Sequence, residues 1–123
     1  MSKKVLIVED DEQISRVYGI KFKQENIETI SAADGEEGFK KISSEKPDLV
    51  LLDLMLPKKD GFWVLDEVRK KDDLKNIPIF VLSNLGQEQD KEKAIKLGAR
   101  DYLVKADISI KEVVDKVKKT LSL

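Results

Sequence analysis

The 123-residue sequence contains no cysteine and no histidine. The lack of cysteine excludes disulfides and thiolate metal sites, and without histidine only oxygen ligands remain for a metal ion. An excess of charge of one sign is also absent, because 23 Lys and Arg residues balance 24 Asp and Glu residues. This balance gives no broad attraction to nucleic acid or to an anionic membrane, and we find no recognition-helix motif.

Long hydrophobic runs are missing as well. The run Val5–Val8 has four residues, and the run Leu49–Leu56 is interrupted by Asp53. Both are far shorter than the roughly 18 residues that span a bilayer, and neither resembles the core of a signal peptide. With 41% hydrophobic residues the chain is too apolar for disorder. We therefore expect one folded domain over residues 1–123, located in the cytoplasm.

Short apolar runs alternate with longer segments of helical periodicity. Helical spacing is clear in Ile14, Val17, Tyr18 and Phe22, and a helix at about residues 87–97 carries Ala94 and Ile95 and ends at Gly98. Five strands are predicted, at residues 5–8, 27–32, 49–52, 78–82 and 100–104. The pattern predicts a doubly wound α/β sandwich with a parallel sheet covered on both faces.

Polar residues follow the predicted strands, where ligands bind in such sheets. Glu9 and Asp10 follow the first strand, Asp53 the third, Ser83 the fourth and Lys105 the fifth. Two carboxylates about 5 Å apart repel by roughly 3 kcal/mol at an effective dielectric of 20. The acidic groups should therefore attract a cation, and an oxygen-only ligand set favours Mg²⁺.

Each of these residues also has a purely structural interpretation. Asp10 or Asp11 would serve as a helix N-cap, and this is the better interpretation for Asp11. Asp53 and Ser83 would be ordinary turn residues, and Lys105 a surface lysine with its stem packed on the sheet. Their joint occurrence at the strand ends of one sheet edge favours a functional site.

Four stretches that contain these residues resemble the signature regions of response-regulator receiver domains. They are VLIVEDDE, DLVLLDLMLPKKDGF, IFVLSN and GARDYLVK, in the order of the family and across the whole chain. The resemblance implies a single (βα)5 domain of the chemotaxis-receiver, flavodoxin-like type with strand order 2-1-3-4-5. It also implies phosphoryl transfer from a histidine kinase or phosphotransfer protein, because this chain has no histidine to act as donor.

The family pattern assigns a role to each matching position. Asp53 matches the phosphoacceptor. Asp10 and Asp53 match direct Mg²⁺ ligands, Glu9 a ligand that acts through water, and the backbone carbonyl of Met55 the remaining protein ligand. The domain would catalyse only its own phosphorylation and dephosphorylation.

The switch residues are implied in the same way. Ser83 and Lys105 match the groups that contact the phosphoryl oxygens, and Tyr102 matches the aromatic switch residue. Output would pass through the fourth helix, fifth strand and fifth helix to an unknown protein. Two positions depart from the family: Ala106 replaces the usual proline after the lysine, and Asn84 replaces a small residue after Ser83.

Two other functions remain as alternatives. A pseudo-receiver would be an interaction module without phosphotransfer, but the complete set of acidic, hydroxyl and lysine residues argues against it. A small Mg²⁺-dependent phosphatase of the haloacid-dehalogenase type would carry a second aspartate two residues after the nucleophile. Met55 stands at that position, so this alternative is the weaker one.

Overall fold

The computed structural model describes residues 2–123. A five-stranded parallel sheet lies at its centre in the order β2-β1-β3-β4-β5. The strands are β1 (Lys4–Val8), β2 (Glu28–Ala32), β3 (Leu49–Leu52), β4 (Ile79–Ser83) and β5 (Asp101–Val104). The predicted strand order is confirmed, and the predicted strand bounds agree to within one residue. Because β1 lies between β2 and β3, the carboxyl ends of β1 and β3 form the switch point at which such sheets bind ligands.

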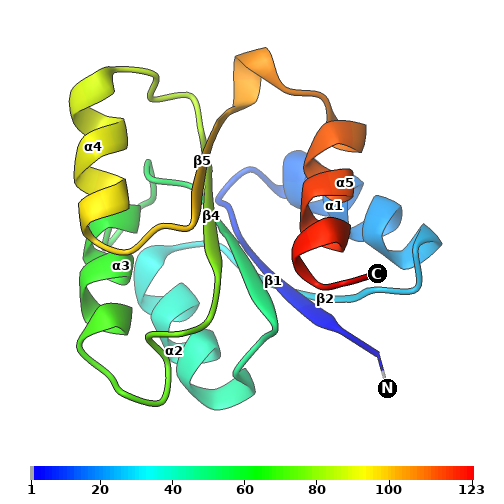
Figure 1. Ribbon diagram of the computed structural model, residues 1–123, viewed down its shortest axis with the longest axis horizontal. Helices are drawn as coiled ribbons and strands as arrows, with labels where there is room; N and C mark the ends of the chain where they lie inside the picture. The colour runs from blue at the N-terminus through cyan, green and yellow to red at the C-terminus, as the bar shows by residue number, and fades with distance from the viewer. Residues whose placement is uncertain (1) are drawn as a thin grey trace.

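Five α-helices cover the two faces of the sheet, as Figure 1 shows. They are α1 (Glu12–Gln24), α2 (Gly35–Glu45), α3 (Gly61–Arg69), α4 (Glu88–Lys96) and α5 (Ile110–Thr120), and a short 3-10 turn, η1 (Lys105–Asp107), precedes α5. Helices α1 and α5 lie on one face, whereas α2, α3 and α4 lie on the other. No helix among residues 2–123 is long and apolar enough to cross a bilayer.

The central strands are buried on both faces, which explains their continuous apolar sequences. In β3, Val50 and Leu52 pack in the core under α2, α3 and α4, while Leu49 and Leu51 pack under α1 and α5. All four of these side chains are at most 1% exposed. The sheet is therefore a rigid platform for the residues that follow its strands.

Side-chain caps mark where α1, α2, α3 and α5 begin. The Asp11 carboxylate accepts hydrogen bonds from the N–H groups of Gln13 and Ile14, which confirms its interpretation as the N-cap of α1. Gly98 has a φ of 105° just after α4, as expected for a glycine at a helix C-terminus.

Two residues of the predicted helical faces are more exposed than their apolar character suggests. Val17 on α1 is 38% exposed and Ile95 on α4 is 47% exposed. Ala94 is the only buried residue of α4. Helix α4 is therefore shallowly packed, because its single buried residue is small.

Candidate functional site

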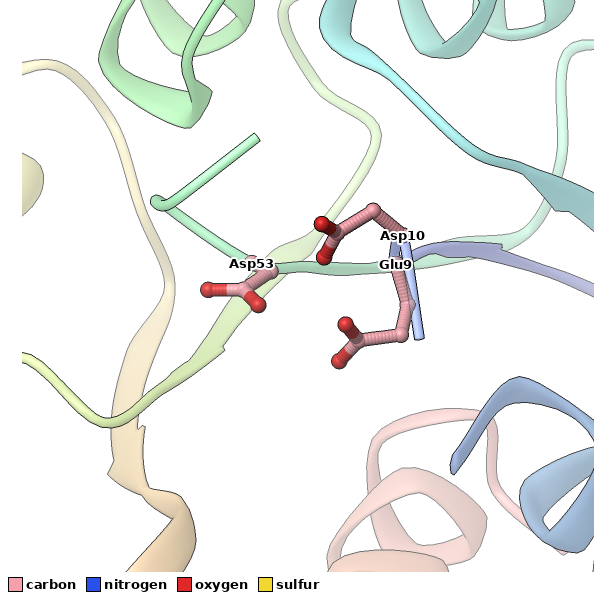
Figure 2. Close-up of side chains that lie close together, drawn as sticks. All are labelled: Glu9, Asp10 and Asp53. Carbon is pink, nitrogen blue, oxygen red and sulfur yellow. The ribbon is translucent and has the colours of Figure 1, made fainter. Parts of the chain in front are cut away.

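Three carboxylates meet where β1 and β3 end. Val8 and Leu52 are register partners, and the Asp53 N–H donates to the Val8 carbonyl at 3.0 Å, so the residues after these strands are neighbours. Figure 2 shows the side chains of Glu9 and Asp10 beside that of Asp53. Each contributes a carboxylate oxygen to a group whose members all lie within 4.8 Å of one another. The predicted acidic cluster is thus present in the fold.

The three acids differ in burial. Glu9 and Asp53 are each 6% exposed, whereas Asp10 is exposed. The Glu9 carboxylate accepts a hydrogen bond from the Asp11 N–H, and Asp53 Oδ1 accepts one from the Met55 N–H, both at 3.1 Å. Burial nevertheless raises the pKa of Glu9 above its ordinary value, because the charged form loses hydration. A positive charge beside Glu9 opposes this effect, because it favours the charged form of the carboxylate.

Lys105 supplies such a charge in the structure. Its Nζ lies 2.9 Å from Asp53 Oδ2 and 2.5 Å from Glu9 Oε1, and its side chain is 16% exposed. Burial opposes the charged form of the lysine, but the hydrogen bonds to Glu9 and Asp53 outweigh burial and raise the pKa of Lys105. The ammonium group therefore bridges the two buried carboxylates.

The direct contact between Lys105 and Glu9 was not predicted from the sequence. The family resemblance implied that Glu9 acts as a metal ligand and that Lys105 contacts the phosphoryl group, so no ion pair between the two was expected. A signal was available, because the two residues carry opposite charges at strand ends on the same edge of the sheet.

The donor chemistry of the cluster fits Mg²⁺. The three groups are carboxylates, which hard cations prefer, and a magnesium ion takes few protein ligands while keeping several waters. Exposed Asp10 leaves one side of the cluster open to solvent, so a hydrated ion has access. The residues present are therefore compatible with this ion.

Ser83 and Tyr102 are connected through the loop after β4. Ser83 is fully buried, and its Oγ accepts a hydrogen bond from the Leu85 N–H at 3.4 Å. The Tyr102 hydroxyl donates to the Leu85 carbonyl at 2.5 Å, and the tyrosine is 7% exposed. Burial raises the pKa of Tyr102, which keeps its hydroxyl protonated as a donor. Leu85 was not foreseen because its backbone makes the link, and side-chain patterns do not report on backbone groups.

The two positions that depart from the resembled family pattern, Asn84 and Ala106, are both exposed. Asn84 is exposed although its neighbour Ser83 is buried, so the asparagine side chain is directed toward solvent. Ala106 belongs to the 3-10 turn Lys105–Asp107, and its peptide bond to Lys105 is trans. The Met55 side chain is 58% exposed beside Asp53.

Comparisons with known proteins agree with this geometry. The family model described as the response regulator receiver domain matches residues 5–118. The chain is 40% identical over 98% of its length to the alkaline phosphatase synthesis transcriptional regulatory protein PhoP of Bacillus subtilis, and covers 49% of that protein. It is 40% identical over 97% of its length to the probable transcriptional regulator ycf27 of Cyanophora paradoxa, covering 48% of it. It spans about half the length of the curated relatives it matches.

A solved structure shows the same fold. The receiver domain of the Francisella response regulator 1452 superposes with a TM-score of 0.90 at 33% identity, with 98% of each chain covered. Receiver domains of this family bind Mg²⁺ through acidic residues, act with histidine kinases and serve signalling rather than conventional enzymatic roles. The matched length, the strand order and the acidic cluster together show that this chain belongs to the response regulator receiver domain family.

Proposed function

We propose that Asp53 is the phosphoacceptor and that residues 1–123 act as one receiver domain. The position of Asp53 supports this most strongly, since it directly follows the central strand β3, belongs to the acidic cluster and pairs with Lys105. The donor is a phosphohistidine of a histidine kinase or phosphotransfer protein, because residues 1–123 contain no histidine. A cytoplasmic location remains a prediction.

The reaction transfers a phosphoryl group from nitrogen to oxygen. An oxygen of the Asp53 carboxylate forms a bond to phosphorus as the phosphorus–nitrogen bond breaks, and the bond electrons return to the imidazole of the donor. Lys105 already donates to Asp53 Oδ2, so its ammonium group is placed to stabilise charge on the phosphoryl oxygens. Ser83 supplies a hydroxyl from the adjacent strand end. The product is an acyl phosphate, which water hydrolyses.

Asp10, Asp53, Glu9 and the backbone carbonyl of Met55 are the residues that we propose hold Mg²⁺. When bound, this ion neutralises negative charge on the acids and on the phosphoryl group. Asp10 is exposed and carries no pairing to Lys105, so it offers its carboxylate most readily. Glu9 is partly engaged by Lys105, in keeping with a role through water.

Wild type should bind Mg²⁺ with an affinity in the millimolar range, because few protein ligands are available. The Asp10→Asn variant should bind the ion about tenfold more weakly than wild type. Titration followed by NMR amide shifts around Asp53 measures this. Asp11→Asn is the matched control, since asparagine also caps a helix and Asp11 lies outside the cluster. Equal affinities for Asp10→Asn and wild type would contradict the ligand set.

Phosphorylation should act on the surface of α4, β5 and α5 through the loop after β4. The phosphoryl group adds negative charge and acceptor oxygens, which attract the Ser83 hydroxyl and Lys105. Ser83 and Tyr102 both contact Leu85, so movement of Ser83 changes the tyrosine environment. The shallow packing of α4 gives this response a low energetic cost. The downstream partner is an unknown protein that binds this surface.

The Ser83→Ala variant should fold normally but lose this coupling. In wild type, beryllofluoride should change amide shifts from Ser83 through Tyr102 more than those of α2. In the variant, we expect the changes to stay near Asp53, because the hydroxyl link to Leu85 is absent. Two-dimensional NMR with and without beryllofluoride measures this. Changes in wild type that are confined to the phosphoryl site would show that the domain is not a switch of this kind.

Function as an interaction module without phosphotransfer is the alternative. It predicts no acyl phosphate even with an active donor. The relatives named as transcriptional regulators are about twice as long as this chain, so DNA binding is not proposed for these residues. We propose that this chain signals through protein contact.

A further inference from the structure

Residues 53–60 join β3 to α3, and the backbone of this loop packs against two glycines, Gly61 of α3 and Gly35 of α2. Gly61 begins α3, and its N–H donates to the Leu54 carbonyl at 3.0 Å. A Cβ at Gly61 would lie 2.4 Å from the Asp53 carbonyl oxygen and 2.7 Å from the Leu54 Cα, well inside van der Waals contact. The base of the loop therefore closes against the Asp53 backbone only because this residue is glycine.

The far side of the loop rests on the first turn of α2. A Cβ at Gly35 would lie 2.0 Å from the Lys59 carbonyl oxygen and 2.6 Å from its carbonyl carbon. The Gly35 N–H also points at the Pro57 carbonyl, with a long donor–acceptor distance of 3.5 Å. Both neighbours are backbone groups of the loop, so they cannot rotate away as a side chain can.

Two further features hold the same segment. Lys58 has a φ of 65°, in the left-handed region that residues other than glycine rarely occupy, so its surroundings must hold it there. Lys58 Nζ lies 3.7 Å from Asp34 Oδ2, while Asp34 Oδ1 caps α2 by accepting from the Glu37 N–H. The N-terminus of α2 thus fixes the loop at residues 57, 58 and 59.

This loop carries the backbone of the acceptor site. The Met55 N–H donates to Asp53 Oδ1 at 3.1 Å, and the Met55 carbonyl is the proposed backbone ligand for Mg²⁺. Only three residues separate Met55 from the Lys59 contact, so a displacement of the Lys59 backbone must be absorbed within a short, strained segment.

We propose that Gly35 is a positioning residue for the acceptor site: its missing side chain lets the Lys59 backbone seat on α2 and so fixes the Met55 backbone beside Asp53. This inference rests on the proposed function for the roles of Met55 and Asp53. Gly35 does not touch the reacting atoms and acts through the loop.

Alanine substitutions at three glycines distinguish an effect on the position of the loop from an effect on the stability of the fold. Gly38 lies in the same helix, but its added Cβ would meet the Val8 side chain at 2.8 Å and not the loop. Gly19 lies in α1, where the added Cβ would make an ordinary contact of 3.5 Å with Thr29 Oγ1. Gly38→Ala therefore controls for poorer helix packing, and Gly19→Ala for the exchange itself.

The test measures three quantities for each variant: amide shifts of residues 55–60 without metal, Mg²⁺ affinity and the midpoint of urea unfolding. In Gly35→Ala, we expect shifted loop amides and Mg²⁺ affinity reduced by about tenfold or more, the size of effect known for groups that orient metal ligands. In Gly38→Ala, we expect a lower unfolding midpoint but wild-type loop amides and affinity. A folded Gly35→Ala protein with wild-type amides and affinity would overturn the proposal.

A Gly35→Ala protein that does not fold is remade together with Gly19→Ala, since alanine stabilises a helix interior relative to glycine. If this double variant is also unfolded, Asp34→Asn decides, because asparagine keeps the cap and removes the charge that pairs with Lys58. We then expect Mg²⁺ binding about twofold to threefold weaker, the modest effect of an ion pair whose lysine is exposed, and unchanged affinity would overturn the proposal. If wild type does not bind Mg²⁺, the proposed function fails, but the metal-free loop amides still decide the role of Gly35.

Discussion

The Asp53→Asn variant is expected to take up no acid-labile phosphate from a phosphohistidine donor or a small phosphodonor. The amide of asparagine is not a nucleophile of comparable strength. Glu9, the other carboxylate that pairs with Lys105, follows β1 and not the central strand β3. Labelling with radioactive phosphate, followed by acid and alkali treatment, measures the loss.

Asp60→Asn is the matched control for this result. Asp60 lies in the loop after Asp53 and caps α3 by accepting from the Trp63 N–H, a role that asparagine also fills. Its variant should therefore be labelled like wild type. Labelling of Asp53→Asn at the wild-type level would refute the assignment of the acceptor.

The Lys105→Met variant should accept phosphate about 100-fold or more slowly, comparable to the loss of one preorganised charge-stabilising donor. Its Mg²⁺ affinity should be equal to or tighter than that of wild type, because the ammonium group no longer competes for the oxygens of Glu9 and Asp53. Initial rates of phosphorylation at saturating Mg²⁺ and a separate metal titration measure the two effects.

Lys116→Met provides the comparison for removal of a lysine outside the site. Lys116 is on α5, and its Nζ lies 3.6 Å from Asp101 Oδ2. About half of the lysine side chain is exposed. This variant should keep the wild-type rate, since exposed ion pairs contribute little. A wild-type rate for Lys105→Met would remove the lysine from the mechanism.

The sequence was sufficient for the architecture because its signals are local and repeated. The continuous apolar run at residues 49–52 indicated a strand buried on both faces, and both faces of β3 are buried. Parallel topology then brings strand ends together, which placed Glu9, Asp10 and Asp53 in one cluster. The strand order itself came from family resemblance and not from periodicity.

Details of the site depend on contacts that no local pattern reports. The reach of Lys105 to two carboxylates depends on the spacing of β1, β3 and β5 and on the rotamer of a long side chain. The Tyr102 hydroxyl donates to the backbone carbonyl of Leu85, so the residue type at position 85 does not predict the contact. Apolar character was also a poor guide to burial at Ile95, because this side chain on α4 is 47% exposed.

Chemical mapping of the phosphorylated residue tests the central claim most directly. Borohydride reduces an acyl phosphate to an alcohol, which converts a phosphorylated aspartate to homoserine that peptide mass spectrometry can locate. After phosphorylation in the presence of Mg²⁺, we predict homoserine at position 53 and unmodified aspartate at position 10. Homoserine at another position, or none under conditions in which the donor is active toward a different receiver domain, would contradict the account.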